Sequence, residues 1–314
     1  MINNSYGRPD ATVHILGGDE TVRGRRPDVA LSLRPALALS HTFSLPEDGP
    51  DGRRLLTMAD PDRPLAITVD GPIATLTMSR PEKRNAMCDA LLATIDGFYS
   101  RPPEGVRVVV LTGSGGHFCS GLDLSEHVAR DAETTMRHSR NWHRVMETVQ
   151  FGGLVTVSAM EGAVIGGGLE LAAATHVRIA EPSVIFQLPE GRRGIFVGGG
   201  ASVRIGRILG ADRMIEMMLT GRKYGADEGL RLGLAHYSVG AGEAMPLARE
   251  LAAKIAGNAP LSNYIMVQAL SRISDMATAD GLFTESLCAA ITQTSPDAVE
   301  GLRAFLEKRA PTFR

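Results

Sequence analysis

The sequence predicts an α/β fold, because segments with strand periodicity alternate with segments of helical periodicity from residue 65 onward. Residues 65–69 and 73–78 alternate apolar and small polar side chains around Asp70-Gly71-Pro72, a pattern typical of a β-hairpin. Residues 106–112 form a continuous β-branched run, as in a strand buried on both faces. After about residue 200 the chain is mainly helical. We therefore expect a sheet-containing core followed by a helical region.

The remaining elements follow from the same two periodicities. Helical spacing predicts helices over 87–99, 125–149 and 168–174, and apolar runs predict buried strands over 154–159 and 176–180. Four C-terminal helices are expected, at 242–256, 260–273, 278–292 and 295–309. This order places loops at the ends of buried strands, which is where sites form in such folds.

The first 57 residues differ in composition from the rest of the chain. They contain no lysine, and arginines are scattered among aspartates without sustained periodicity. We expect residues 1–57 to be a poorly ordered extension. Met58 directly precedes the first strand pattern, and we hypothesise that it is the natural start. The rest divides into a core over 58–255 and a C-terminal helical region over 256–314.

Composition excludes several classes of function. The 314 residues carry a net charge of −2, which argues against a nucleic-acid binder that needs clustered Lys and Arg. The most apolar stretch, 153–174, contains Glu161 and Glu170 and many glycines, so we expect no membrane span. The three cysteines are far apart, which favours a reducing, cytoplasmic setting over disulfides or a zinc site.

Two glutamates are the strongest candidates for chemistry. Glu170 follows the triple glycine at 166–168, and Glu190 lies in a Leu-Pro-Glu-Gly segment. A glycine run that opens a helix can direct backbone N–H groups at a developing oxyanion. Two carboxylates in one apolar site cannot both ionise freely, so one can act as a base while the other acts as an acid.

Four segments together resemble one family. They are Arg-Pro-Glu-Lys-Arg-Asn-Ala at 80–86, the stretch from Leu-Thr-Gly to Cys-Ser-Gly-Leu-Asp-Leu at 111–124, Glu-Gly-Ala-Val-Ile-Gly-Gly-Gly-Leu-Glu-Leu at 161–171 and Phe-Gln-Leu-Pro-Glu at 186–190. From about residue 65 to the C-terminus the chain resembles the enoyl-CoA hydratase/isomerase, or crotonase, superfamily. The resemblance implies a ClpP/crotonase-like spiral of repeated ββα units. It also implies that the C-terminal helices build a homotrimer, often stacked into a hexamer as a dimer of trimers.

The resemblance further implies a substrate and a set of catalytic groups. Substrates would be acyl-CoA thioesters, with the thioester enolate stabilised by the backbone amides of Leu122 and Gly167. Glycines at 121 and 167 allow the close backbone approach that such donors need. Hydratases of the family carry glutamates at both positions matching Glu170 and Glu190, whereas isomerases often keep only the second. The expected activity is therefore an enoyl-CoA hydratase, a hydro-lyase.

Two alternatives stay open from the sequence. One is a Δ3-Δ2 enoyl-CoA isomerase or another crotonase-type acyl-CoA enzyme, in which Glu190 alone shuttles the proton. The other is a non-catalytic acyl-CoA-binding scaffold, against which the intact motifs weigh. One departure also limits the choice of acyl group, because residues 192–200 replace a proline-containing Gly-Ala-Gly-Gly segment common in the family. This loop directly follows Glu190, so it can alter the acyl pocket or the placement of water.

Coenzyme A contacts are also inferred from the resemblance. The positions implied are Arg84, Ala86, Ser120 and Leu122, with Lys308 as a candidate for a coenzyme A phosphate. For Lys308, a helix-terminal lysine that interacts with the helix dipole is an equally good interpretation. Coenzyme A is part of the substrate, so no separate cofactor is expected. His117, His138 and His143 lack metal-ligand spacing, and Cys119 is interpreted as pocket lining rather than a nucleophile.

Overall fold

The chain begins its described part with a β-hairpin. The computed structural model describes residues 64–126 and 130–313, so the extension expected over residues 1–57 lies outside them. Strand β1 (Leu65–Asp70) pairs antiparallel with β2 (Ile73–Met78), from Leu65 opposite Met78 to Asp70 opposite Ile73. Gly71 in the turn has a φ of 54°, which glycine adopts without strain. The predicted hairpin is confirmed.

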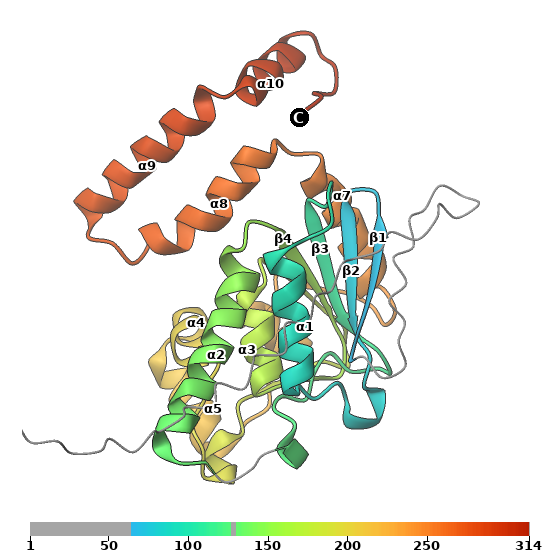
Figure 1. Ribbon diagram of the computed structural model, residues 1–314, viewed down its shortest axis with the longest axis vertical. Helices are drawn as coiled ribbons and strands as arrows, with labels where there is room; N and C mark the ends of the chain where they lie inside the picture. The colour runs from blue at the N-terminus through green and yellow to red at the C-terminus, as the bar shows by residue number, and fades with distance from the viewer. Residues whose placement is uncertain (1–63, 127–129, 314) are drawn as a thin grey trace, which may run out of the picture. The chain divides into compact units, whose positions relative to one another are not determined.

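A six-stranded sheet forms the centre of the fold (Figure 1), with the order β1-β2-β3-β4-β6-β8. Its remaining strands are β3 (Val108–Gly113), β4 (Val155–Met160), β6 (Val177–Ala180) and β8 (Tyr237–Ser238), each parallel to its neighbour from β2 onward. Every residue of β3 and β4 is buried. The continuous apolar runs at these positions therefore mark strands that are covered on both faces.

Helices cover the two faces of this sheet. On one face, α1 (Asp89–Ser100), α2 (Ala132–Phe151) and α3 (Gly167–Ala174) share a core with Val109 and Leu111 of β3. On the other face, α7 (Ala244–Ala256) packs alanines against Val108 and Val110. Figure 1 shows α1 and α7 on opposite sides of the strands. Alternate side chains of β3 thus enter separate cores, as the two-residue period of a strand requires.

A small second sheet was not expected from the sequence. Strand β5 (Ala163–Ile165) pairs in parallel with β7 (Ile185–Gln187), and each is only three residues long. Three residues are too few to show a periodicity. The pairing has a structural consequence, because β5 leads directly into α3 while β7 leads toward the 3-10 helix η3 (Glu190–Arg193). It therefore fixes the two glutamate-bearing segments side by side.

The second half of the chain is mainly helical, as predicted. It contains α4 (Ala201–Leu209), α5 (Ala211–Thr220), α6 (Ala226–Leu232), α8 (Pro260–Ile273), α9 (Thr278–Gln293) and α10 (Pro296–Leu306). Helix α8 contacts α2 and β4, and α9 packs on α8. None of the residues of α8 is buried. No helix in residues 64–126 and 130–313 is both long and apolar enough to cross a membrane.

Two predicted helix boundaries were wrong. The helix expected from Ser125 begins at Ala132 instead, because the Asp131 side chain accepts a hydrogen bond from the Thr134 amide and caps the helix there. Leu124–Glu126 forms the separate 3-10 helix η2. The helix expected to reach Arg309 ends at Leu306, and Lys308 lies beyond it with a φ of 53°. Lys308 is therefore not in the last turn of a helix.

Candidate active site

One cavity brings together the four residues expected to be catalytic. Leu122, Gly167, Glu170 and Glu190 all line a cavity of about 160 Å³. Its other walls come from the N-terminal half of α2 and from the loop after η3. The lining residues from these walls include Arg130, Thr135, His138, Ser139, Trp142, Arg193, Ile195, Phe196, Val197, Gly198 and Gly199.

The two segments carrying the candidate oxyanion donors are hydrogen-bonded to each other. The Cys119 amide donates to the Ala163 carbonyl at 2.8 Å, and the Ile165 amide donates to the Cys119 carbonyl at 3.0 Å. Gly121 has a φ of 94°, and a Cβ atom there would lie 2.7 Å from the Ile165 carbonyl oxygen. A Cβ atom at Gly168 would lie 2.2 Å from the Cys119 oxygen. Glycine is required at both positions because no side chain fits between the segments.

Neither candidate donor amide has a recorded acceptor within residues 64–126 and 130–313. Gly167 is the first residue of α3, so its N–H has no acceptor within the helix. The Met87 amide donates to the Gly121 carbonyl, and the Met87 carbonyl accepts from the Asp123 amide. Neither of these hydrogen bonds uses the N–H of Leu122. In the described part of the chain no acceptor is recorded for the Leu122 amide. Two adjacent unpaired N–H groups on a cavity wall can stabilise an oxyanion.

Glu170 is buried and held by the loop that follows η3. Its exposed fraction is 4%, and its Oε1 accepts hydrogen bonds from the amides of Gly199 at 2.8 Å and Ala201 at 3.0 Å. Burial raises the pKa of the Glu170 carboxyl, and these two amides oppose that rise because they stabilise the charged form. The loop over 192–200, which departs from the family pattern, therefore determines the position of this carboxylate.

Glu190 is buried without comparable support. Its exposed fraction is 6%, and within the described residues its Oε2 has no hydrogen-bond partner. Burial raises the pKa of Glu190 to about 7, and the nearby Glu170 adds to the rise. A Cβ atom on Gly166 would lie 3.0 Å from Glu190 Oε1, so this side chain approaches the backbone that opens α3. Near neutral pH, Glu190 can therefore both release and accept a proton.

Most of the expected coenzyme A contacts lie together, outside the cavity. The Arg84 carbonyl accepts from the Ser120 amide at 3.0 Å, and the Ser120 hydroxyl donates to the Lys83 carbonyl at 3.0 Å. Ala86 is buried in the same loop. Ser120 lies two residues before Leu122 in the chain, and Met87, next to Ala86, forms a β-bridge with Leu122. Lys308 follows α10 and does not line the cavity. The structure thus groups Arg84, Ala86 and Ser120 and leaves Lys308 apart.

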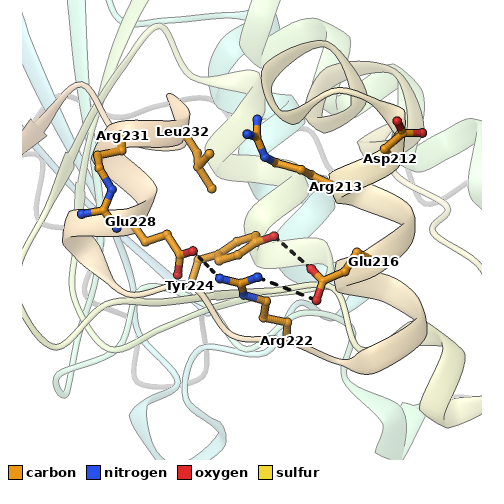
Figure 2. Close-up of a pocket in the computed structure, with 8 residues that line it drawn as sticks. All are labelled: Asp212, Arg213, Glu216, Arg222, Tyr224, Glu228, Arg231 and Leu232. Carbon is orange, nitrogen blue, oxygen red and sulfur yellow. Dashed lines mark hydrogen bonds and ion pairs between the residues drawn. The ribbon is translucent and has the colours of Figure 1, made fainter.

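A larger surface hollow of about 400 Å³ lies elsewhere and contains none of the predicted site residues (Figure 2). Arg222 contacts carboxylate oxygens of Glu228 at 2.5 Å and Glu216 at 3.9 Å. The Tyr224 hydroxyl donates to Glu216 at 3.2 Å. These charged groups largely satisfy one another, so the smaller cavity with the two glutamates is the better candidate site.

Comparisons with known proteins agree with this geometry. Residues 68–314 match the sequence profile of the enoyl-CoA hydratase/isomerase family. The chain belongs to that family. A crystal structure of a candidate enoyl-CoA hydratase from Rhodopseudomonas palustris is 46% identical, with a TM-score of 0.77 over 80% of this chain and 97% of that one. The fold is therefore the predicted crotonase-like α/β fold.

Two curated relatives show the breadth of the family. Enoyl-CoA hydratase domain-containing protein 2, mitochondrial, of Homo sapiens is 32% identical and covers 78% of this chain and 86% of its own length. (E)-benzylidenesuccinyl-CoA hydratase of Thauera aromatica is 31% identical and covers 80% of this chain and 99% of its own length. The first name states a compartment, the mitochondrion, and the second states an acyl group, benzylidenesuccinyl.

Two residues with a structural role in the family motifs were missed by sequence reasoning. Asn85 has a φ of 56°, and its side-chain amide donates to the carbonyls of Ser114 and His117 at 2.9 and 2.6 Å. Asp123 accepts from Arg80 at 2.7 Å and Lys83 at 2.9 Å. Together they fasten the segment at 80–86 to the one at 111–124. Asparagine tolerates this left-handed backbone, which was the available sequence signal.

Burial of Asp123 would by itself raise the pKa of its carboxyl, but the hydrogen bonds from Ser125, Lys83 and Arg80 hold it well below its usual range. This carboxylate is therefore a charged structural anchor. Cys119 differs, since burial raises the pKa of its thiol to about 12, with smaller opposing effects from the backbone of Gly121 and Met87. A neutral buried thiol is a poor nucleophile.

Proposed function

We propose that this protein is an enoyl-CoA hydratase, which adds water across the 2,3-double bond of an enoyl-CoA thioester. The observation that carries the proposal is one small cavity that combines two buried carboxylates with two unpaired backbone amides. Membership of the enoyl-CoA hydratase/isomerase family supports it. The reaction needs a base for water, an acid for the α-carbon and donors for the enolate oxygen, and the cavity offers candidates for each.

The amides of Leu122 and Gly167 would hold the thioester oxygen while negative charge develops on it. The first turn of α3 adds the positive end of its dipole at the same place. Losing one such donor typically costs about 3–4 kcal/mol of transition-state stabilisation, so this pair outweighs any single surface contact. The acyl chain would extend from the amides past the two glutamates.

The surroundings of the two glutamates suggest separate roles. Glu170 accepts two amide hydrogen bonds, which favour its ionised form, so we assign it as the base that removes a proton from water as oxygen attacks Cβ. Glu190 has an oxygen without a partner and a pKa raised to about 7 by burial, so we assign it as the acid that protonates Cα. The Cα–Cβ π bond and one O–H bond of water break, and a C–O bond forms at Cβ and a C–H bond at Cα. The proton from water passes to Glu170, and Glu190 gives its own proton to Cα.

A specific observation favours a second candidate, a Δ3-Δ2 enoyl-CoA isomerase. Within the described residues, Oε2 of Glu190 is buried without a hydrogen-bond partner, whereas Oε1 of Glu170 is already engaged by two amides. A single carboxyl could then move a proton between the α and γ carbons while Glu170 only shapes the site. This candidate uses the same oxyanion donors.

Substrate binding follows the same assignment. We propose that Arg84, Ala86 and Ser120 border the coenzyme A moiety, with Lys308 as a further candidate, and that no cofactor beyond the thioester is needed. The relative named for benzylidenesuccinyl-CoA indicates that members of this family differ in acyl group. We retain the cytoplasm as the proposed compartment because Cys88, Cys119 and Cys288 are free thiols.

We also propose a homotrimer or a hexamer. Helices α8, α9 and α10 expose many large apolar side chains: Tyr264, Met266, Leu270, Leu282, Phe283, Leu287, Ile291, Val299, Leu302, Phe305 and Leu306. Exposed apolar surface on this scale is typical of subunit contacts. Light scattering should give three or six times the mass of one chain. A purely monomeric protein at micromolar concentration would contradict the proposal.

A panel of thioesters tests the function. Purified enzyme is supplied with 2-enoyl-CoA and 3-enoyl-CoA substrates of several chain lengths, and conjugation and hydroxyacyl product are both followed. A hydratase converts 2-enoyl-CoA to 3-hydroxyacyl-CoA. Conversion of 3-enoyl-CoA to conjugated product without hydration would instead identify the isomerase. Binding of thioesters without turnover across the panel would indicate a non-catalytic protein.

A further inference from the structure

The lining of the candidate cavity falls into two groups of residues. One group includes Leu122 and Gly167, whose segment adjoins the loops that contain Arg84 and Ser120. The other group comes from the start of α2 and the loop after η3. We call this second group the acyl end, because a thioester whose oxygen binds the two amides and whose double bond lies at the glutamates would direct its acyl chain toward it.

Two arginines line the acyl end. Arg193 is exposed at the end of η3, and Arg130 is half-buried just before α2. No hydrogen bond or ion pair of either guanidinium is recorded within residues 64–126 and 130–313. Neighbouring arginines differ: Arg137 binds Glu133 at 2.7 Å, and Arg192, directly before Arg193, donates to the Thr220 carbonyl at 2.5 Å. Arg193 and Arg130 thus line the cavity with no recorded partner in the described part of the chain.

The remaining side chains at this end include polar groups. Thr135, His138 and Ser139 of α2 line it together with the apolar Ile195 and Phe196. The acidic residues of the lining are Glu170 and Glu190, and in the described part of the chain no ion pair of either with Arg193 or Arg130 is recorded. Two cationic side chains therefore border a small cavity whose own carboxyls compensate them poorly. A ligand anion would supply the missing counter-charge.

We propose that the acyl group of the substrate carries a carboxylate, which Arg193 binds with the help of Arg130. This inference rests on the proposed acyl-CoA function and specifies its substrate class as the monothioester of an unsaturated dicarboxylic acid. A guanidinium presents two parallel N–H donors that match a carboxylate, so recognition is directional as well as electrostatic.

The charge of Arg193 also reaches Glu190. It lowers the pKa of Glu190, in opposition to burial. A substrate carboxylate on Arg193 would cancel part of that influence and keep Glu190 protonated for transfer to Cα. The substrate would then contribute to setting the protonation state of the acid that acts on it.

Binding of non-reactive thioesters tests the proposal independently of turnover. Glutaryl-CoA and valeryl-CoA have acyl chains of the same length and differ in a terminal carboxylate or methyl group. By calorimetry we expect the wild-type enzyme to bind glutaryl-CoA roughly tenfold more tightly, as for a charge-assisted contact. Arg193→Gln should abolish most of that preference, and Arg130→Gln should reduce it. Arg137→Gln, on α2 but paired with Glu133, serves as the matched control.

The outcomes separate the possible errors. Equal binding of both thioesters, tighter binding of valeryl-CoA, or binding of neither would overturn the proposal. Equal weakening of both by Arg193→Gln would also overturn it, because the arginine would then contact the phosphates that both thioesters carry. The hydration assay with an uncharged enoyl-CoA is a separate measurement. If glutaryl-CoA binds selectively but no enoyl-CoA is hydrated, the proposed reaction fails while the carboxylate site stands.

Discussion

The two walls of the candidate site are built in different ways. One wall, which we call the polar wall, consists of Leu122, Gly167, Glu170 and Glu190, and its glutamates are only 4% and 6% exposed. Another wall, the loop wall, consists of residues 195–197, where Ile195 is 41% and Phe196 71% exposed. The polar wall is continuous with the hydrogen-bonded core, whereas the loop wall is largely solvated. The two walls therefore differ in burial, and under the proposed function we expect the polar wall to carry the chemistry and the loop wall to contact the acyl group.

Removing either carboxylate should produce the largest effect. Glu170→Gln and Glu190→Gln keep the side-chain shape but cannot take up or deliver the proton, so each should lower kcat for hydration about 10²- to 10⁴-fold. Steady-state assays with a matched enoyl-CoA measure the loss. Binding of a saturated acyl-CoA is the control and should change little. Hydration at the wild-type rate in both variants would show that the polar wall is misassigned.

The pH profile should identify Glu190 as the acid. Its pKa is raised to about 7 by burial, and the acid form is the active one. The hydration rate should therefore fall as pH rises through about 7, with nearly a tenfold loss per unit well above it. A constant rate between pH 6 and pH 9 would contradict the assignment.

The same carboxyl should affect stability with a defined sign. Because the folded pKa of Glu190 is raised from 4.5 to about 7, the folded protein binds this proton more tightly than the unfolded chain. Its contribution is fully present below about pH 4.5 and is lost as pH rises through 7. Denaturant unfolding of wild-type and Glu190→Gln protein across this window provides the measurement. The difference in unfolding free energy between the two should shift in favour of the variant with rising pH.

A glycine pair tests how the loop after η3 supports the polar wall. A Cβ atom at Gly199 would lie 2.6 Å from Glu170 Oε2, whereas one at Gly198 would meet only Ser139 at 3.6 Å. Gly199→Ala should therefore displace Glu170 and lower kcat roughly 10-fold, as expected when hydrogen bonds to a charged group are disturbed. Gly198→Ala is the matched control and should be near wild type. Equal effects of the two substitutions would mean that general loop strain, not contact with Glu170, is responsible.

The sequence predicted the core of the fold better than its site. The hairpin and β3 were recognisable because their periodicity or β-branched composition extends over six residues or more. Strands β5 and β7 were not, since three residues carry no period. Yet this small sheet aligns the two glutamate segments. We inferred from the family resemblance that Glu170 and Glu190 belong to the same site. Their spacing in the sequence could not have established this.

The support of Glu170 could not be predicted at all. The amides of Gly199 and Ala201 reach it across 29 and 31 residues of chain. Any residue except proline can supply a backbone N–H donor, so the residue types in a sequence motif do not identify these contacts. Sequence reasoning identified 192–200 as a departure from the family and expected an effect on the pocket, but the contact with Glu170 appears only in three dimensions.

Truncating a side chain of the loop wall should have the smallest effect on kcat. Phe196 is 71% exposed and lines the cavity without contacting the carboxylates in any recorded interaction. Phe196→Ala should change kcat for a four-carbon enoyl-CoA by less than about 3-fold, because truncating a mostly solvated side chain removes little packing. For acyl chains that reach the ring, KM should rise several-fold, since each methylene that loses burial forfeits about 0.8 kcal/mol. Leu219→Ala is the control, because Leu219 is similarly exposed, at 78%, and lies on α5 outside the cavity. A drop in kcat as large as that of Glu170→Gln would show that the two walls do not act separately, because the loop wall would then be needed to hold the catalytic geometry.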